Sequence, residues 1–391
     1  GGNPVVKLLL ILERFSAISL VALSHSRVEG NEIAVAPCGV FALDTLGTSA
    51  VANRVTASLA GVVLAIATEC DASDDRVDAS YADAPTMGVS LFGAARSVAE
   101  RNAISNVANG IITALGTGLR VQDNDLYLTD TGIVSLIDVD LELRGNTVED
   151  AAYTGIESIL SLHELTLAHD RALRCGYRAP GLAPTAAIGI VVLLAIGLVT
   201  IDSCHVIDTG ESSNAKAPVF SGQRHGILVL FAIGTRVHGC TVASQPLVGN
   251  AVVNAGSRAL RLWMLSPAAV IALLDGVGRP MTPFADATDN VAEQSVFTLV
   301  EALGAGEVMF ATNRCLNFSD SPKLPTVLLA GTRITATGNR VKASGAVPAL
   351  FAGFDAALSA VGNITTSGAT LVPVGPAVLV PAPYPSFNVI T

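Results

Sequence analysis

Four basic side chains are the first candidates for a binding site in this sequence. Arg224 and His225 are adjacent, and Arg236 and His238 follow them in what we expect to be the same turn of a repeat. Guanidinium and imidazolium groups form charge-assisted hydrogen bonds to carboxylates, so this group could bind a carboxylated sugar. The alternative is that all four are ordinary turn and surface residues. The sequence offers them as binding candidates and assigns no catalytic residue.

Motifs for the common enzyme chemistries and for metals are absent from the sequence. It has no Ser-His-Asp arrangement, nucleophile elbow, Walker loop or dinucleotide fingerprint. Its densest acidic group is best interpreted as one solvated turn and consists of Asp71, Asp74, Asp75 and Asp78. The six cysteines form no Cys-x-x-Cys pair, so we expect free buried thiols and no zinc site. No metal and no cofactor are predicted.

Charge and hydropathy exclude two further classes of partner. The net charge of −10 argues against a nucleic-acid ligand, because phosphates require a basic surface. Residues 186–201 are strongly apolar, but a spanning helix needs about 20 residues and this run is shorter. It also contains Gly189 and Gly197, and it keeps the register of the repeat. We therefore interpret the run as buried strands and predict no membrane span.

A short motif recurs along the chain and predicts the fold. It consists of Asn or Asp, any residue, and then an aliphatic residue; up to Asn146 it returns at steps of 22 residues with one step of 27, and from Asn313 onward at steps of 26 and 24. The copies begin at Asn31, Asn53, Asp75, Asn102, Asn124 and Asn146, and again at Asn313, Asn339 and Asn363. Cys204 and Cys240 take the same position in two further copies. We expect these two cysteines to be stacked core thiols rather than a disulfide.

A Gly followed by an aliphatic residue forms a second marker, which normally comes 8 residues after the start of the triplet. The one long step and the one long offset both exceed the norm by 5, so an insertion lies within residues 78–87. The same reasoning predicts a longer loop at residues 208–225. Between residues 266 and 294 the repeat is lost, and we expect a second long loop there. We expect the Gly to supply the backbone freedom that a tight corner needs.

Residue types and rhythm indicate that the repeat is made of strands. Residues 139–143 alternate with the two-residue period of a half-buried strand, whereas helical solenoid repeats run to about 33–47 residues. Three short strands with their turns fit one repeat, and successive turns would stack at about 4.8 Å. Equivalent Asn residues would then form a column whose side-chain amides hydrogen-bond to one another. Val, Ile and Leu would form aliphatic files inside.

The predicted fold is all-β: a single right-handed parallel β-helix of about a dozen coils of about 22–26 residues, with two longer loop insertions. We place this β-helix at residues 1–375. A Pro-rich C-terminal tail follows at residues 376–391 and should end the stack, because Pro cannot donate to a strand ladder. Residues 1–15 offer no clear cap, so we expect another subunit or further chain to cover that end.

In this pattern the chain resembles the pectin-lyase-like right-handed parallel β-helix superfamily over about residues 15–375, and in particular bacterial and phage surface or tail-associated members. The resemblance implies a scaffold that sugar-acid hydrolases and lyases often use. Polygalacturonase-like members carry Asn-Thr-Asp, Asp-Asp, Gly-His-Gly and Arg-x-Lys motifs. This chain lacks Asn-Thr-Asp and has partial matches at Asp74-Asp75, Arg224-His225-Gly226 and Arg340-Val341-Lys342. Asp75 and His225 would lie roughly 25–30 Å apart, whereas a glycosidase needs its two groups within roughly 5–10 Å.

Three functional hypotheses follow. The leading one is a non-catalytic structural or binding β-helix of a bacterial or phage surface appendage or tail-associated spike, with a surface glycan as candidate ligand. Its partners would be copies of itself or other subunits of a larger assembly, and its location extracellular, on the cell surface or on a virion. The first alternative is a polysaccharide lyase or glycoside hydrolase whose site forms between subunits or beside the long loops. The second is a filament subunit that self-associates end to end.

Overall fold

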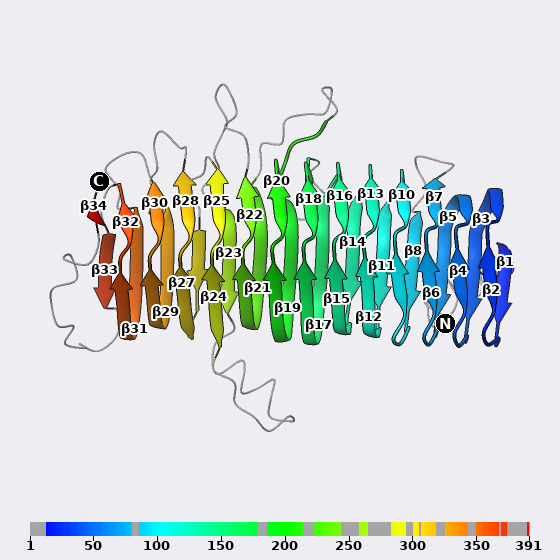
Figure 1. Ribbon diagram of the computed structural model, residues 1–391, viewed down its shortest axis with the longest axis horizontal. Coiled ribbons are helices and arrows are strands. Elements are labelled where there is room, and N and C mark those ends of the chain that lie inside the picture. Colours follow the sequence, from blue (N-terminus) through cyan, green and yellow to red (C-terminus); the bar gives the residue numbers. More distant parts are fainter. Residues whose placement is uncertain are drawn as a thin grey trace, which may run out of the picture.

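The structure is a computed structural model and describes residues 13–79, 86–177, 186–213, 223–243, 258–264, 283–294, 300–304, 306–317, 325–342, 349–366, 369–373 and 389–390. These residues form an elongated all-β rod in which the strands lie side by side along the long axis (Figure 1). The described strands pair in parallel, and apart from the strands at the two ends of the rod each pairs with strands one coil before and one coil after it. The chain is therefore a parallel β-solenoid, as the repeat predicts.

Three ladders of strands run along the rod. The first contains β1 (Ser16–Val21), β3 (Glu32–Leu43), β5 (Arg54–Ala65), β8 (Met87–Phe92), β11 (Asn109–Ala114), β14 (Thr131–Leu136), β17 (Thr154–Ala168), β19 (Ala186–Asp202), β21 (Gln223–His238), β23 (Arg258–Met264), β26 (Val300–Leu303), β29 (Val327–Thr337), β31 (Leu350–Val361) and β33 (Ala369–Pro373). The long strands β17, β19, β21, β29 and β31 continue into the second ladder.

The second ladder is completed by β2 (Arg27–Glu29), β4 (Ser49–Val51), β6 (Asp71–Ser73), β9 (Val98–Glu100), β12 (Thr117–Gln122), β15 (Val139–Arg144), β24 (Phe284–Thr288) and β27 (Glu307–Ala311). The third begins with the first residues of β3 and β5. It continues through β7 (Arg76–Ala79), β10 (Ala103–Ser105), β13 (Asp125–Tyr127), β16 (Thr147–Glu149), β18 (Arg171–Leu173), β20 (His205–Ile207), β22 (Thr241–Ala243), β25 (Val291–Gln294), β28 (Arg314–Asn317), β30 (Arg340–Lys342), β32 (Ile364–Thr365) and β34 (Val389–Ile390).

The core consists of files of like aliphatic side chains. In the first ladder Val62 lies between Val40 and Val89, and Ile133 lies between Ile111 and Ile156. All of these side chains are almost completely buried. Stacking branched side chains of equal size at the strand spacing keeps the interior densely packed with few large aromatic residues, such as Phe41 and Phe310. Residues 186–201, which we predict to be buried strands, lie in β19. No helix in the described part of the chain is long and apolar enough to span a membrane.

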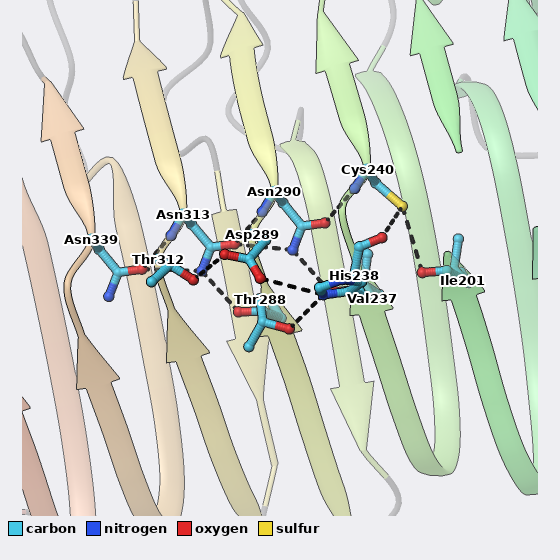
Figure 2. Close-up of polar contacts among 11 residues, drawn as sticks. Ile201, Val237, His238, Cys240, Thr288, Asp289, Asn290, Thr312, Asn313 and Asn339 are labelled. Carbon is cyan, nitrogen blue, oxygen red and sulfur yellow. Dashed lines mark hydrogen bonds and ion pairs between the residues drawn. The ribbon is translucent and has the colours of Figure 1, made fainter. Parts of the chain in front are cut away.

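The predicted column of asparagines is confirmed. Each side-chain amide donates to the side-chain oxygen of the next rung at 2.8–3.0 Å, and Figure 2 shows the segment from Asn290 to Asn339. That same oxygen also accepts the backbone N–H of the preceding rung. The rungs are Asn31, Asn53, Asp75, Asn102, Asn124, Asn146, Asp170, Cys204, Cys240, Asn290, Asn313, Asn339 and Asn363. Cys204 and Cys240 are free and buried, as predicted.

The residue before each rung of this amide column adopts a left-handed backbone conformation. Its φ lies between 52° and 68° in every coil of the described part from Gly30 to Gly362. The position holds Gly in some coils and Asp, Ala, Arg, His, Ser or Thr in others. The column thus follows a corner of constant geometry, and the buried amides stabilise that corner by hydrogen bonds from inside the rod.

The Gly marker has a different role from the one expected. Gly61, Gly88 and Gly132 are not in the left-handed region. A Cβ on Gly61 would lie 2.6 Å from the carbonyl oxygen of Gly88 and 2.4 Å from Cγ1 of Val77. Glycine is therefore required because the backbone of the first ladder lies close to the aliphatic side chains of the third ladder. The left-handed conformation that we expected glycine to allow does not occur at these positions.

The register also locates the insertions. Ala57 pairs with Ala79 at a step of 22, whereas Ala60 pairs with Met87 at a step of 27, so the extra residues enter between Ala79 and Met87. Within that predicted insertion, residues 80–85 lie outside the described residues. Half of the predicted loop at 208–225 (residues 214–222) also lies outside them.

Two predicted boundaries need correction. The loop expected at residues 266–294 extends too far, because β24 and β25 pair in register with their neighbours and Asn290 is a rung of the amide column. Ala292 there replaces the larger aliphatic residue that marks other repeats, so the triplet is inconspicuous. Residues 265–282 lie outside the described part. β34 pairs in parallel with β32, so the third ladder reaches Ile390, beyond the boundary expected at residue 375; the rest of the 376–391 tail is not described.

Candidate functional site

The structure separates the four basic candidates into two pairs at opposite ends of β21. Arg224 and His225 lie in the first ladder, where His225 is 2% exposed. The Arg224 side chain is 13% exposed, and its Nη1 lies 3.5 Å from Oε1 of Glu211. Burial raises the pKa of that Glu211 carboxyl, and Arg224 opposes this shift. This first pair is thus mostly enclosed by the chain itself.

Arg236 and His238 lie in the second ladder on an exposed face. The Arg236 guanidinium lies over the ring of Phe284, 5.6 Å from its centre. His238 Nδ1 lies 3.2 Å from Thr288 Oγ1 and 3.6 Å from Asp289 Oδ2 in the next coil (Figure 2). These contacts connect neighbouring coils at the corner beside the amide column. The four residues do not form one continuous basic surface.

The partial pectinase-like motifs remain far apart. Along the amide column, Asp75 is followed by Asn102, Asn124, Asn146, Asp170 and Cys204, so five coil steps separate Asp75 from Cys204, or about 24 Å. His225 follows in the coil after Cys204. Asp75 and His225 therefore do not share a site, as the repeat predicts.

A groove of about 410 Å³ on the outer face of the second ladder is the candidate site that the structure provides. It is open to solvent and crosses three successive coils, because its lining comes from β12, β15 and β17. The lining residues are Gly118, Leu119, Arg120, Asp140, Leu141, Glu142, Glu164 and Thr166. Three carboxylates, one guanidinium and one hydroxyl thus face the same hollow.

The parallel register and one glycine shape this groove. Arg120 pairs with Glu142, and Glu142 pairs with Thr166, so their side chains form one outward file at the strand spacing. Gly118 has a φ of 61°, and a Cβ at this position would meet only Arg96 Cγ at 3.7 Å. The missing side chain therefore leaves one end of the groove open.

A β-bulge adds the third carboxylate. Val139 pairs with Leu162, but Leu141 pairs with Leu165, so two residues of β17 oppose Asp140. A bulge bends its strand and redirects the side chains beside it. Glu164 is one of the two residues opposite Asp140, and it is exposed and lines the groove. Without the bulge, the outward file would contain one acid fewer at this point.

The groove carries an excess of negative charge. Asp140, Glu142 and Glu164 face a single guanidinium, that of Arg120. At the rim, His163 Nδ1 lies 2.5 Å from Asp140 Oδ1, and this hydrogen bond raises the pKa of His163 above its ordinary value. Glu142 Oε1 also lies 3.7 Å from Nη1 of Arg144. Such a surface favours neutral or cationic ligands over acidic ones.

This lining suits carbohydrate chemistry. Carboxylates accept hydrogen bonds from sugar hydroxyls, and the guanidinium and threonine hydroxyl donate to sugar oxygens. Glu142 and Glu164 lie on adjacent strands, whose spacing is about 4.8 Å, and glycosidases place two carboxylates roughly 5–10 Å apart. Within the described part of the chain, no cluster of His, Cys, Asp or Glu could hold a metal ion.

Sequence reasoning missed the groove because none of its residues forms a recognisable motif. One signal was present: the column step lengthens from 22 residues, between Asn124 and Asn146, to 24 residues, between Asn146 and Asp170. One of the two extra residues is that of the bulge in β17. A repeat that is a few residues longer than its neighbours therefore indicates where a solenoid redirects its side chains.

Comparisons with known proteins identify no relative for this chain. No protein-family model matches the chain, and no curated protein matches it either. Among solved structures, the chain is similar to the catalytic unit of a thermostable GH87 α-1,3-glucanase from Streptomyces thermodiastaticus strain HF3-3, with a TM-score of 0.29 and 11% identity. The match covers 96% of this chain and 66% of the glucanase unit, so this chain spans just under two thirds of that protein. A likeness of this degree carries no argument about ligand or activity.

Proposed function

We propose that this chain is a right-handed parallel β-helix that acts as a glycan-binding shaft of a bacterial or phage surface appendage or tail-associated spike. It would lie on the cell surface, outside the cell or on a virion, among copies of itself or other subunits. The observation that supports the ligand class is the groove over β12, β15 and β17, with its three carboxylates, one guanidinium and one hydroxyl. A rigid rod also suits presentation of such a site away from a surface.

The charge of the groove narrows the ligand. Three carboxylates against one arginine would repel uronic acids and sulfated sugars, and would attract neutral or amino sugars. This differs from the carboxylated sugar that the basic candidates Arg224, His225, Arg236 and His238 suggest. The glycan we propose is therefore neutral or amino-substituted and lies along the rod across three coils.

Calorimetric titration with neutral, amino-substituted and uronic oligosaccharides tests this proposal. The double variant Glu142→Gln/Glu164→Gln should weaken binding of a neutral or amino glycan by at least about tenfold, because hydrogen bonds to charged acceptors are worth about 1.5–3 kcal/mol. Glu307→Gln is the matched control, since Glu307 is exposed in the same ladder and is remote from the groove. Equal loss in the control, preference for uronic acids, or absence of any glycan binding would contradict the proposal.

A glycoside hydrolase is the second candidate, and one observation favours it. Glu142 and Glu164 face one groove from adjacent strands, which is compatible with an acid and a second carboxylate beside a glycosidic bond. Incubation with the bound glycan separates the two functions. A hydrolase would release shorter sugars and would lose turnover in either single Gln variant, whereas a binding shaft would return the glycan intact.

A further inference from the structure

One corner of the rod carries a line of apolar side chains that point outward. The corner follows the first ladder, and its residue in each successive coil is Ile66, Gly93, Leu115, Ile137, Leu160, Leu194 and Phe231. Backbone hydrogen bonds from these positions to the next coil, such as Ile137 N to Ile159 O at 3.0 Å, stack them directly. We call the six apolar members of this line the apolar edge.

Members of the apolar edge are well exposed. Leu115 is 61% exposed, Ile66 57%, Phe231 48% and Ile137 41%, while Leu160 and Leu194 are half-buried. Towards the first coils the same corner position is taken by Asp44 and Ala22, so the apolar line begins at Ile66. Four of the large apolar side chains that are exposed in the described part thus lie at one corner, namely Ile66, Leu115, Ile137 and Phe231. Soluble monomers usually scatter such residues singly, and contiguous patches mark interaction surfaces.

The backbone conformation at the apolar edge is unfavourable for the residues found there. Every member has a φ between 51° and 61°, in the left-handed region that favours Gly and Asn. Ile66 and Ile137 are β-branched, and a branched residue in this region is a genuine outlier that costs on the order of 1 kcal/mol or more. Exposure and backbone strain both disfavour isoleucine here in an isolated rod. Their coincidence points to contacts that the isolated rod does not make.

The repeat and the convex shape of the apolar edge indicate which kind of partner can bind along it. The line from Ile66 to Phe231 spans six coil steps, about 29 Å, and is straight because the coils stack in register. A helix repeats every 5.4 Å and would lose phase with rungs 4.8 Å apart within a few turns. A small ligand would find no enclosure on a convex corner. A second copy of this chain offers the same repeat and the same length.

Size and charge also fit a second copy. From Ile66 to Phe231 the edge extends over about 29 Å, and a strip of that length would bury on the order of 450 Å² per copy, which is the size of a weak, transient interface. The charges beside the edge are already paired within the chain: Arg96 with Glu69 at 3.0 Å, and His163 with Asp140 at 2.5 Å. A second copy would therefore approach without local like-charge repulsion, despite the net charge of −10.

We propose that two copies of this chain associate side by side and antiparallel, apolar edge against apolar edge, around a two-fold axis. Such an interface is isologous, so the same residues serve both partners and the assembly closes at two. The interface is small, so the dimer forms reversibly at about micromolar concentration. This inference is independent of glycan binding in the groove.

Asparagine substitutions in the apolar edge test the dimer without damaging the fold. Asn tolerates the left-handed backbone, so Ile137→Asn and Leu115→Asn should keep or raise the thermal midpoint of the monomer while removing apolar contact. In sedimentation velocity over a concentration series, each variant should weaken dimerisation by about tenfold or more. The matched control is Met309→Asn, because Met309 is 44% exposed in β27 and lies away from the edge.

The single tryptophan provides a second readout. Trp263 lies 6.5 Å from Phe231, ring centre to ring centre, at the end of the apolar edge. Its fluorescence should shift with the concentration of the wild-type chain and stay constant in Ile137→Asn. A wild-type chain that is monomeric throughout would overturn the proposal, as would equal weakening by Met309→Asn or no effect of the edge variants. Fibres that persist in the edge variants would show end-to-end association instead.

Discussion

Asn146 donates its side-chain amide to Oδ1 of Asp170 at 2.9 Å, and its backbone N–H donates to the same oxygen at 2.8 Å. A buried aspartate thus fills a rung that asparagine fills in neighbouring coils. An asparagine would use its amide to continue the column, but Asp170 Oδ2 is buried and has no hydrogen-bond partner. Burial raises the pKa of Asp170 to about 7, and the two donors from Asn146 only partly oppose this shift. The column therefore contains a titrating rung.

Asp170→Asn should stabilise the protein in a pH-dependent way. Because the folded-state pKa is raised, the folded chain binds more protons than the unfolded chain between about pH 4 and pH 7. Stability is then full below about pH 4 and falls as the pH rises through 7. Removing the titration should add up to about 4 kcal/mol at pH 8 and little at pH 4.

Urea unfolding of wild type and Asp170→Asn at both pH values measures this difference. Asp75→Asn provides a graded companion, since burial raises the pKa of Asp75 only to about 6 and its Oδ2 also has no partner. The gain in the free energy of unfolding should be smaller for Asp75→Asn than for Asp170→Asn, and it should reach its full value at a lower pH. A pH-independent gain in both variants would mean that the aspartates are not titrating in the column.

Removing a central rung should cost far more than removing a terminal one. Asn124 accepts from Asn102, donates to Asn146 at 2.8 Å and donates to the carbonyl of Ala99 at 3.0 Å, all in a buried setting. Asn124→Ala leaves these groups unsatisfied and should lower the free energy of unfolding by about 3 kcal/mol or more. Asn31→Ala, at the partly exposed end, should cost under about 1 kcal/mol. Equal losses in urea melts would argue against a continuous column.

Glycines of the two structural types should lose different amounts of stability when replaced by alanine. A Cβ at Gly132 would lie 2.4 Å from the carbonyl oxygen of Gly155, so Gly132→Ala must displace backbone and should cost about 3 kcal/mol or prevent folding. Gly93 has a φ of 58° and open space around its Cβ position. Gly93→Ala should cost only about 1 kcal/mol, and Gly93→Asn less. Thermal midpoints of the three variants test the order.

All six thiols should be unreactive in the folded chain. They are free and buried, and burial raises the pKa of Cys38, Cys175 and Cys315 to about 12. Thiolates are the reactive form, so labelling with an aromatic disulfide reagent at neutral pH should proceed only at the rate of unfolding. Six thiols should react at once in denaturant. Rapid labelling of even one cysteine in native buffer would contradict this core.

The repeat makes much of the architecture predictable from sequence, for physical reasons that particular residues illustrate. A rung such as Asn124 is buried and bonded on both sides, so its residue type is tightly constrained and the pattern is visible. Asn290 was overlooked because Ala292 beside it is small, although the rung itself is intact. The role of Gly61 was misassigned, because a close approach between ladders leaves the same sequence signature as a tight corner.

The groove was less predictable than the fold. Its carboxylates lie on outward positions, which the repeat leaves free to vary, and they meet only through the register of three coils. The bulge that adds Glu164 depends on a shift between β15 and β17 that no single segment reveals. Arg224 and His225 resemble part of a known motif, but both side chains are largely buried in the structure. In this chain, small irregularities in the repeat length therefore indicate the candidate site better than short sequence motifs do.

Disulfide trapping across neighbouring coils tests the central claim, that coils stack in parallel with this register. Arg54 and Arg76 are exposed and pair directly between β5 and β7. Arg54→Cys/Arg76→Cys should form an intramolecular disulfide quickly under mild oxidation, since paired Cα atoms at about 4.8 Å fall within disulfide range. Arg54→Cys/Asp78→Cys, displaced by two residues, should form it slowly or not at all. Equal rates, or a preference for the displaced pair, would contradict the stacked solenoid.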